Sequence, residues 1–394
     1  MENEKLKMEN YKQTEIGLIP EDWEVKKLGE IGNIITGSTP STTNLEYYKN
    51  GTFDFIGPAD LNSNKYIDNA EKKVTEKGLN VGRILKQKSV LVTCIGSTIG
   101  KIGINKNICI TNQQINAIET DKNNSDFIYY SILERKGRLK LIAGEQAVPV
   151  LNKTEFSKFK IPLPPLPEQK KIADCLSTWD SAIEKQSALI TALTDRKKAL
   201  MQQLLTGKKR LPGFSGEWKE VKLGEVCEIK KGSQINKIEL SSNLGFPVIN
   251  GGIEPSGYHD DWNVAENTIT ISEGGNSCGF INFIKEKFWS GGHCYTLQNL
   301  KININKIFLF YFLKNSENQI MKLRVGSGLP NIQQKDIKNF EILLPKIEEQ
   351  TAIAEILATA DRELQLQKEK LAQLQTQKKG LMQVLLTGKK RLIN

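Results

Sequence analysis

The chain has 394 residues, 39% of them hydrophobic and 25% charged, which suits a globular protein of two or three domains and excludes a disordered or fibrous one. Its formal net charge of +10, from 55 Lys and Arg against 45 Asp and Glu, fits a polyanionic partner or serves only solubility. The six cysteines form no C-x-x-C pair and there are two histidines, which argues against a structural zinc site and for a reducing, cytoplasmic compartment.

Neither a leader nor a membrane span is expected. Residues 1–10 are charged and lack the apolar stretch of a signal peptide. The longest apolar run, residues 307–313, is far shorter than the ~20 residues that cross a bilayer, so a buried element is expected there.

A first globular unit is expected from about Trp23 to Pro164, with mixed strands and helices. Apolar runs at residues 89–93 and 108–110 predict strands, and the glycines between them predict tight turns. Residues 126–142 predict one helix, whose aromatic pair is expected in the core rather than stacked on bases.

A long helix follows this unit. Prolines at positions 162, 164, 165 and 167 mark a rigid entry, and residues 168–206 carry apolar side chains at alternating steps of four and three. Gly207 is expected to stop the helix. The Lys-Lys-Arg run after it, residues 208–210, could neutralise DNA phosphates or simply suit a helix C-terminus, and the sequence favours neither role.

A second globular unit is expected from about Trp218 to Pro345, again followed by a long helix that Gly388 stops. Residues 268–271 predict a strand and residues 305–324 predict a helix with a buried aromatic pair.

The two halves of the chain repeat each other. Residues 204–211 and 385–392 both read Leu-Leu-Thr-Gly-Lys-Lys-Arg-Leu, an offset of 181 that holds without a gap back to Leu163 and Leu344. The beginnings of the units, behind Trp23 and Trp218, match at an offset of 195, so the middle of the first unit is longer. The matching edges predict a shared scaffold, and the divergent middles predict that the two units recognise different things.

The spacing within both helices predicts a coiled-coil seam. A dimerisation zipper and packing of each helix on its own unit are alternatives, but intramolecular antiparallel pairing is favoured because both helices belong to one chain. Polar Gln186 and Lys197 recur as Gln367 and Lys378, which is typical of residues that fix register. The apolar seam residues are Ile172, Leu176, Trp179, Ile183, Ile190, Leu193, Leu200, Leu204, Ile353, Leu357, Leu364, Leu371, Leu374, Leu381 and Leu385.

The sequence indicates no catalytic or metal-binding centre. The glycine-rich residues 96–102 are one residue short of a phosphate loop, and Ile102 stands where Ser or Thr would hold Mg²⁺, so a turn after a strand is expected. Neither His259 nor His293 lies in a recognisable nucleophile motif, and no Asn-Pro-Pro-aromatic tetrad of an amino-methyltransferase is present.

Polar loops instead carry residue types that reach base edges: Asn and Gln for adenine, Lys and Arg for guanine. For any single one of them a solvated loop is the alternative. The candidates for DNA contact are Ser38, Thr39, Asn44, Lys101, Asn112, Gln113, Gln114, Gln146, Lys230, Lys231, Gln234, Asn250, Asn276, His293, Arg324 and Ser327.

Three sequence features together resemble the specificity subunit of Type I restriction-modification enzymes. They are residues 19–29, Ile-Pro-Glu-Asp-Trp-Glu-Val-Lys-Lys-Leu-Gly, residues 161–169, Ile-Pro-Leu-Pro-Pro-Leu-Pro-Glu-Gln, and the twin Leu-Leu-Thr-Gly-Lys-Lys-Arg ends. The second junction, residues 344–350, keeps less of the Pro-Leu-Pro-Glu-Gln pattern. The resemblance covers nearly the whole chain.

The resemblance implies an α+β fold with a pseudo-twofold repeat: two mixed α/β target-recognition domains separated by two conserved helices in an antiparallel coiled coil. The expected segments are residues 1–165, 166–207, 208–347 and 348–394. It implies a non-catalytic subunit that reads a split, asymmetric DNA target.

The same resemblance implies partners for this subunit. Its helices would dock two methyltransferase subunits, which bind S-adenosylmethionine and methylate adenine, and restriction subunits would join them. No cofactor is expected on the chain itself. A self-contained enzyme and a coiled-coil scaffold that binds only protein remain the competing classes.

Overall fold

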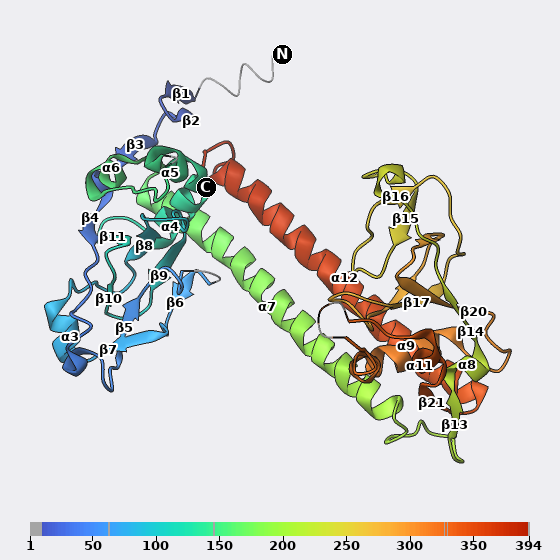
Figure 1. The fold of residues 1–394 in the computed structure, drawn as a ribbon. Helices are drawn as coiled ribbons and strands as arrows, with labels where there is room; N and C mark the ends of the chain where they lie inside the picture. The colour runs from blue at the N-terminus through green and yellow to red at the C-terminus, as the bar shows by residue number, and fades with distance from the viewer. Residues whose placement is uncertain (1–9, 62–63, 145, 327, 329, 393–394) are drawn as a thin grey trace. The chain divides into compact units, whose positions relative to one another are not determined.

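The computed structural model describes residues 10–61, 64–144, 146–326, 328 and 330–392 (Figure 1). The chain divides into two compact units, Met1–Lys185 with Leu371–Asn394, and Gln186–Lys370. Each unit therefore combines one globular region with part of both long helices. The four-segment division expected from the sequence stays a prediction.

The first unit contains two main sheets, ordered β4-β11-β8-β9-β6 and β10-β5-β7, with α4 packed against β8 and β9. Its elements are β1 (Tyr11–Thr14), β2 (Gly17–Pro20), β3 (Glu24–Lys27), α2 (Leu28–Ile31), β4 (Asn33–Thr36), η1 (Leu45–Tyr47), β5 (Phe53–Ile56), β6 (Tyr66–Ile67), β7 (Lys72–Val74), α3 (Glu76–Val81), β8 (Val90–Thr93), β9 (Ile102–Asn105), β10 (Cys109–Thr111), β11 (Ile115–Glu119), α4 (Ser125–Glu134), α5 (Lys136–Ala143), α6 (Lys153–Lys158) and β12 (Lys160–Leu163).

Strand β8 is buried throughout because both of its faces are covered. Val90 and Val92 point into the core beneath α4, whereas Leu91 points into a second core that includes Ile56 and Cys109. Since side chains alternate along a strand, a strand buried on both faces reads as a continuous apolar run. The strands predicted at residues 89–93, 108–110 and 268–271 are confirmed as β8, β10 and β17.

The second unit repeats this plan with the sheets β14-β20-β17-β18 and β16-β15-β19. Its elements are β13 (Lys219–Lys222), α8 (Leu223–Val226), β14 (Glu228–Lys231), η2 (Lys237–Glu239), β15 (Phe246–Ile249), β16 (Tyr258–His259), β17 (Thr268–Ser272), β18 (Ile281–Ile284), β19 (Trp289–Ser290), β20 (Cys294–Gln298), α9 (Lys306–Asn315), α10 (Glu317–Met321), α11 (Gln334–Lys338) and β21 (Glu341–Leu344).

The helix predicted after each main sheet is in fact two helices. Arg135 separates α4 from α5 with φ −102° and ψ 11°, and Ser316 separates α9 from α10 with φ −93° and ψ 6°. These dihedrals lie outside the helical region, so the axis bends there while the apolar pattern continues. Tyr130 and Tyr311 of the aromatic pairs are buried as expected.

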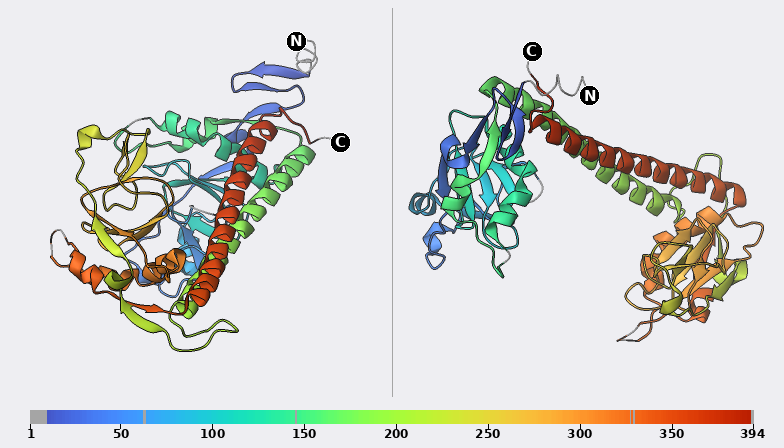
Figure 2. Two further views of the ribbon diagram at one scale, coloured as in Figure 1. Left: turned by 90° about the vertical axis from the view of Figure 1, so that its right-hand side faces the viewer. Right: turned by 90° about the horizontal axis from the view of Figure 1, so that it is seen from above.

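The two long helices are α7 (Leu166–Leu204) and α12 (Ile347–Leu385), each of 39 residues (Figure 2). Gly207 and Gly388 follow them with φ +68° and +73°, the left-handed conformation in which glycine has no steric penalty. The amides of Lys209 and Lys390 then bond back to the carbonyls of Gln203 and Val384, which closes the end of each helix.

Helices α7 and α12 pair in antiparallel fashion within each unit. In the first unit Lys378 of α12 forms an ion pair with Asp180 of α7. In the second unit Lys197 of α7 forms an ion pair with Asp361 of α12, and the Gln186 amide donates to the Gln367 side chain at 2.8 Å. All the predicted seam residues are buried or half-buried, so they mark the paired faces of the helices.

Candidate nucleic-acid interface

Five loops meet at one edge of the first unit. Backbone hydrogen bonds join four of them, and the Lys101 ammonium group donates to the Pro58 carbonyl of the fifth at 3.4 Å. The Cys94 amide donates to the Gln114 carbonyl at 2.7 Å, and the Leu151 amide returns to the Cys94 carbonyl at 2.8 Å. The Gly96 amide binds the Pro149 carbonyl at 2.9 Å, and the Ser38 amide binds the Thr111 carbonyl at 2.8 Å. We call this set the loop edge of the first unit: residues 37–44, 57–61, 94–101, 112–114 and 146–151.

The second unit carries the same hydrogen bonds at equivalent positions. Glu273 donates its amide to the His293 carbonyl at 2.9 Å, and Ile332 returns to the Glu273 carbonyl at 2.8 Å. The Gly275 amide binds the Pro330 carbonyl at 3.0 Å. The second loop edge consists of residues 232–236, 250–252, 273–280, 291–293 and the described part of 324–332. Two sequences that barely match thus build one backbone frame.

The structure places most of the predicted contact residues on these two edges. All eight candidates of the first unit, from Ser38 to Gln146, lie in its loop edge. In the second unit, Lys230 and Lys231 end strand β14 beside the edge, and Ser327 lies outside the described residues. The other second-unit candidates lie within the edge: Gln234, Asn250, Asn276, His293 and Arg324. Their contact with DNA stays a prediction.

Neutral amides line the first loop edge. The Thr39 hydroxyl donates to the side-chain oxygen of the exposed Gln113 at 2.7 Å. Asn112 donates to the side-chain oxygen of Gln114 at 3.0 Å. Side-chain amides that present both a donor and an acceptor match the N6 and N7 pair of adenine.

A buried carboxylate organises the second loop edge. Glu273 is 5% exposed, and its Oε1 accepts from Lys231 Nζ at 2.6 Å and from the Tyr295 hydroxyl at 2.9 Å. Its Oε2 lies 3.4 Å from His293 Nδ1. Burial acts to raise the pKa of Glu273, but the hydrogen bonds from Lys231 and Tyr295 outweigh it and hold the pKa below its ordinary value.

Sequence reasoning missed Glu273 although a signal was present. Residues 272–279 align with residues 93–100 through the glycine pair at the ends of each turn, which places Glu273 opposite Cys94. Burial raises the pKa of the Cys94 thiol to about 12, so Cys94 is a small neutral side chain. Five of the six cysteines are buried in this way, and all six are free.

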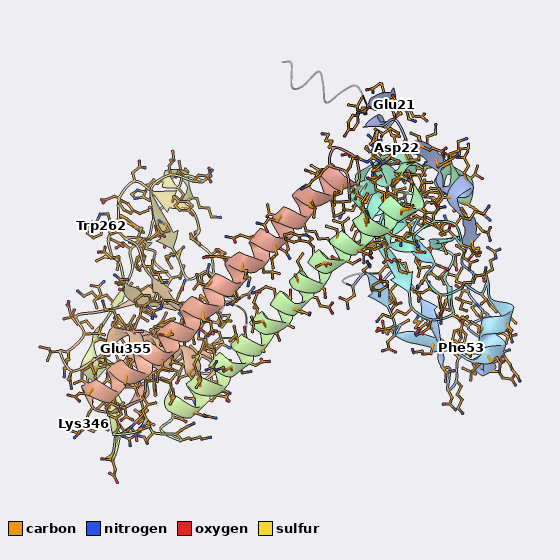
Figure 3. The ribbon with its side chains drawn as sticks, turned by 180° about the vertical axis from the view of Figure 1, so that it is seen from behind. Glu21, Asp22, Phe53, Trp262, Lys346 and Glu355 are labelled. Atoms are coloured by element: carbon orange, nitrogen blue, oxygen red, sulfur yellow. The ribbon has the colours of Figure 1, made fainter. Side chains whose placement is uncertain are left out.

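The arginines of the two Lys-Lys-Arg runs, residues 208–210 and 389–391, have a structural role that the sequence did not indicate, and phosphate contact by the lysines stays a prediction. Arg391 binds both oxygens of Glu168, at 2.7 and 2.8 Å, and the Trp23 indole donates to the same carboxylate at 3.0 Å. Arg391 also binds Asp22, which is labelled in Figure 3. In the second unit Arg210 holds the buried Glu349 at 2.7 Å through two hydrogen bonds.

These arginine–glutamate pairs connect the segment after one helix to the start of the other helix. Their glutamates are 1–3% exposed, so each carboxylate depends on its arginine for compensation. The lysines next to the arginines remain exposed and available to a phosphate backbone.

Within the described residues, no group of three or more His, Cys, Asp or Glu side chains is arranged as metal ligands. In the same part of the chain, no helix is both long and apolar enough to cross a membrane.

The comparisons with known proteins agree with this geometry. Residues 20–194 and 215–376 match the family model described as Type I restriction modification DNA specificity domain. The chain belongs to this family. A specificity subunit of the Type I restriction enzyme MjaVIII from Methanocaldococcus jannaschii is 28% identical over 98% of this chain and 97% of that protein. The HindI specificity subunit from Haemophilus influenzae is 32% identical over 48% of this chain and 42% of its own length.

Solved structures of the same family share the fold. The S subunit of a Type I restriction-modification system from M. genitalium superposes with a TM-score of 0.65 at 18% identity, covering 92% of this chain and 96% of that one. The subunit from Thermoanaerobacter tengcongensis gives a TM-score of 0.51 at 19% identity, over 94% and 98% of the two chains. The α+β fold with two repeated units is thereby confirmed.

Proposed function

We propose that this chain is the DNA-specificity subunit of a Type I restriction-modification enzyme and that each loop edge reads one half of a bipartite target. One observation carries the proposal: two equivalent backbone frames in one chain present different side chains. A frame repeated with changed chemistry suits the reading of two unlike half-sites, since side-chain donors and acceptors distinguish the bases.

The net charge of +10 and the exposed lysines beside both arginine–glutamate pairs support sequence-independent affinity for the phosphate backbone. Phosphate contacts would set the register of the protein on the duplex, and the loop edges would select the bases. The chain is a non-catalytic component, so the chemistry would belong to its partners.

The partners follow from the same proposal. Helices α7 and α12 would dock two methyltransferase subunits, which would bind S-adenosylmethionine and methylate adenine, and restriction subunits would join this assembly. No cofactor is assigned to the chain itself. A scaffold that binds only protein would need no pair of differently substituted loop edges.

A methylation map tests the proposal. The chain would be co-expressed with the methyltransferase subunit of its own system in a host without DNA methylation, and methyladenine would be located by single-molecule sequencing. The expected result is a bipartite motif that vanishes when this chain is omitted. Methylation that persists without the chain, or a motif with no gap, would contradict the proposal.

A further inference from the structure

The two units differ at one edge of their main sheets. In the first unit β6 adds itself to β9 as a parallel strand: the Ile104 amide donates to the Lys65 carbonyl and the Lys106 amide to the Ile67 carbonyl, both at 2.8 Å. In the second unit the sheet ends at β18, the counterpart of β9. The chain therefore supplies the edge strand of the first sheet itself, and the second sheet has one strand fewer.

The additional strand of the first sheet lies in the segment that connects two strands of the smaller sheet. Residues 57–71 join β5 to β7 and include β6, whereas the shorter segment 250–257 joins the equivalent strands β15 and β16. The Phe283 amide, which corresponds to that of Ile104, donates instead to the side chain of its own neighbour Asn282 at 2.9 Å. Such a local bond is easily exchanged for a bond to an added strand.

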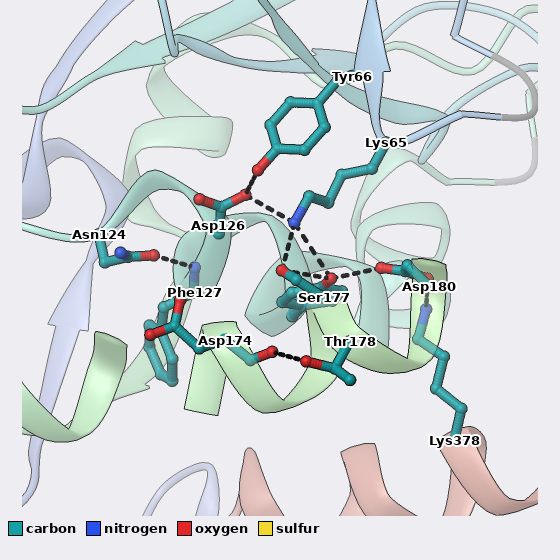
Figure 4. Close-up of polar contacts among 11 residues, drawn as sticks. Lys65, Tyr66, Asn124, Asp126, Phe127, Asp174, Ser177, Thr178, Asp180 and Lys378 are labelled. Carbon is teal, nitrogen blue, oxygen red and sulfur yellow. Dashed lines mark hydrogen bonds and ion pairs between the residues drawn. The ribbon is translucent and has the colours of Figure 1, made fainter. Parts of the chain in front are cut away.

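Lys65 shows what fills the space between the sheet edge and the helices in the first unit (Figure 4). Its ammonium group is 2.7 Å from Asp126 of α4 and donates to Ser177 of α7 at 2.8 Å. The Tyr66 hydroxyl donates to the same Asp126 carboxylate. The segment thus fixes a buried positive charge against partners on two helices.

The second unit has a groove at this place, with a volume of about 840 Å³. Its lining is apolar where the first unit is polar, because Ile307 stands at the position of Asp126 and Ala358 at that of Ser177. Phe283, Phe310 and the exposed Leu366 are also part of the apolar lining. A segment bound in this groove should therefore place an apolar side chain where the first unit has Lys65. A lysine there would lack the carboxylate and hydroxyl partners that Lys65 has.

The rim of the same groove is basic. Lys285, Arg362 and Lys368 border it, and all three are exposed. Asp361 also contributes to the lining, but Lys197 and the Tyr311 hydroxyl already bind it. Charge complementarity thus favours an occupant whose apolar residue is flanked by acidic ones.

We propose that β18 takes up an extended segment of the methyltransferase subunit as an added parallel strand, with an apolar side chain in this groove and acidic residues along its rim. The inference rests on the proposed function. Strand addition uses backbone hydrogen bonds for affinity and the groove for selectivity. Among the described residues, the second unit alone offers this site, because β6 already occupies the corresponding edge of the first.

Hydrogen exchange measured by mass spectrometry tests the proposal on the full chain, alone and in complex with the methyltransferase subunit. In the complex, the amides of Phe283 and Lys285 are expected to exchange at least about tenfold more slowly. The amides of Ile104 and Lys106 in the first unit are the internal control, since they donate to the carbonyls of Lys65 and Ile67 in both samples.

Two exposed apolar residues give a matched pair of variants. Leu366→Asp places a charge in the groove without disturbing a buried residue, and it should abolish the protection at β18 and weaken the complex about tenfold. Ile302→Asp changes a fully exposed residue outside the groove and should do neither.

The outcomes separate the inference from the proposed function. A bipartite methylation motif with unchanged exchange at residues 282–286 would overturn the inference alone. Protection that grows with the concentration of the chain by itself would assign the edge to a second copy and also overturn it. The absence of any complex and of any motif would overturn both.

Discussion

In the first unit, strand β4 ends at Thr36, whose hydroxyl donates to Asn116 at 2.6 Å beside the neutral Cys94. In the second unit the equivalent strand ends at Lys231, whose register partner is Tyr295, and both bind the buried Glu273. The backbone frame is the same, yet the first unit has the neutral Cys94 where the second has the charged Glu273. The frame and the recognition chemistry are therefore set by different residues.

The largest loss of stability is expected where a buried glutamate at the start of a long helix loses its arginine. Arg391→Ala leaves the Glu168 carboxylate, which is 3% exposed, with only the Trp23 indole, and should lower the free energy of unfolding by about 3 kcal/mol. Urea denaturation measures this loss. Lys389→Ala, an exposed neighbour, is the control and should change stability little. Equal stability of the two variants would show that the pair does not hold the unit together.

DNA binding by the second loop edge should depend on the charge of Glu273. Glu273→Gln keeps the shape but removes the charge that orients Lys231 and His293, so affinity for the second half-site should fall about tenfold while the first half-site is unaffected. Cys94→Ser at the equivalent place in the first unit is the matched control. Fluorescence anisotropy with DNA altered in one half-site at a time checks both, and a loss that affects both half-sites equally would contradict the comparison.

The lowered pKa of Glu273 should make the free energy of unfolding depend on pH. Because the pKa of Glu273 is lowered in the folded chain from its ordinary value of 4.5, the stabilisation is present above pH 4.5 and is lost as the pH falls through the lowered value. The Glu273→Gln variant should lack this part of the acid sensitivity. Denaturation curves at pH 7 and pH 4 measure it, and identical pH slopes for both proteins would refute it.

The smallest effect is expected at the polar pair shared by both helices. Gln186→Leu alone leaves Gln367 without its 2.8 Å partner and should cost about 1 kcal/mol, whereas the double leucine variant should be neutral or more stable. A double-mutant cycle in urea gives the coupling energy. A coupling of zero would mean that the pair does not specify the register of the helices.

Sequence reasoning predicted the elements that depend on repeated local patterns. The helices α7 and α12 follow from regular apolar spacing with glycine stops, and the strands β8 and β17 follow from apolar runs. The bends at Arg135 and Ser316 could not be predicted, because the apolar pattern continues through them.

The sequence predicted which loops carry the candidate site but not how these loops contact one another. Asn112 and Gln113 stood out by residue type, but the contact of Cys94 with Gln114 joins segments that are distant in the sequence. Glu273 and the arginine–glutamate pairs act through burial, which no residue type reveals by itself. The missing counterpart of β6 showed only as a length difference between the repeats.

If each unit reads its own half-site, exchange of one unit should change one half of the target. Residues 23–164 would be replaced by the corresponding segment of a relative with a different target, and methyladenine would be mapped after co-expression with the methyltransferase subunit. The account predicts a motif in which one half changes and the other half is retained. A motif in which both halves change, or neither, would contradict it.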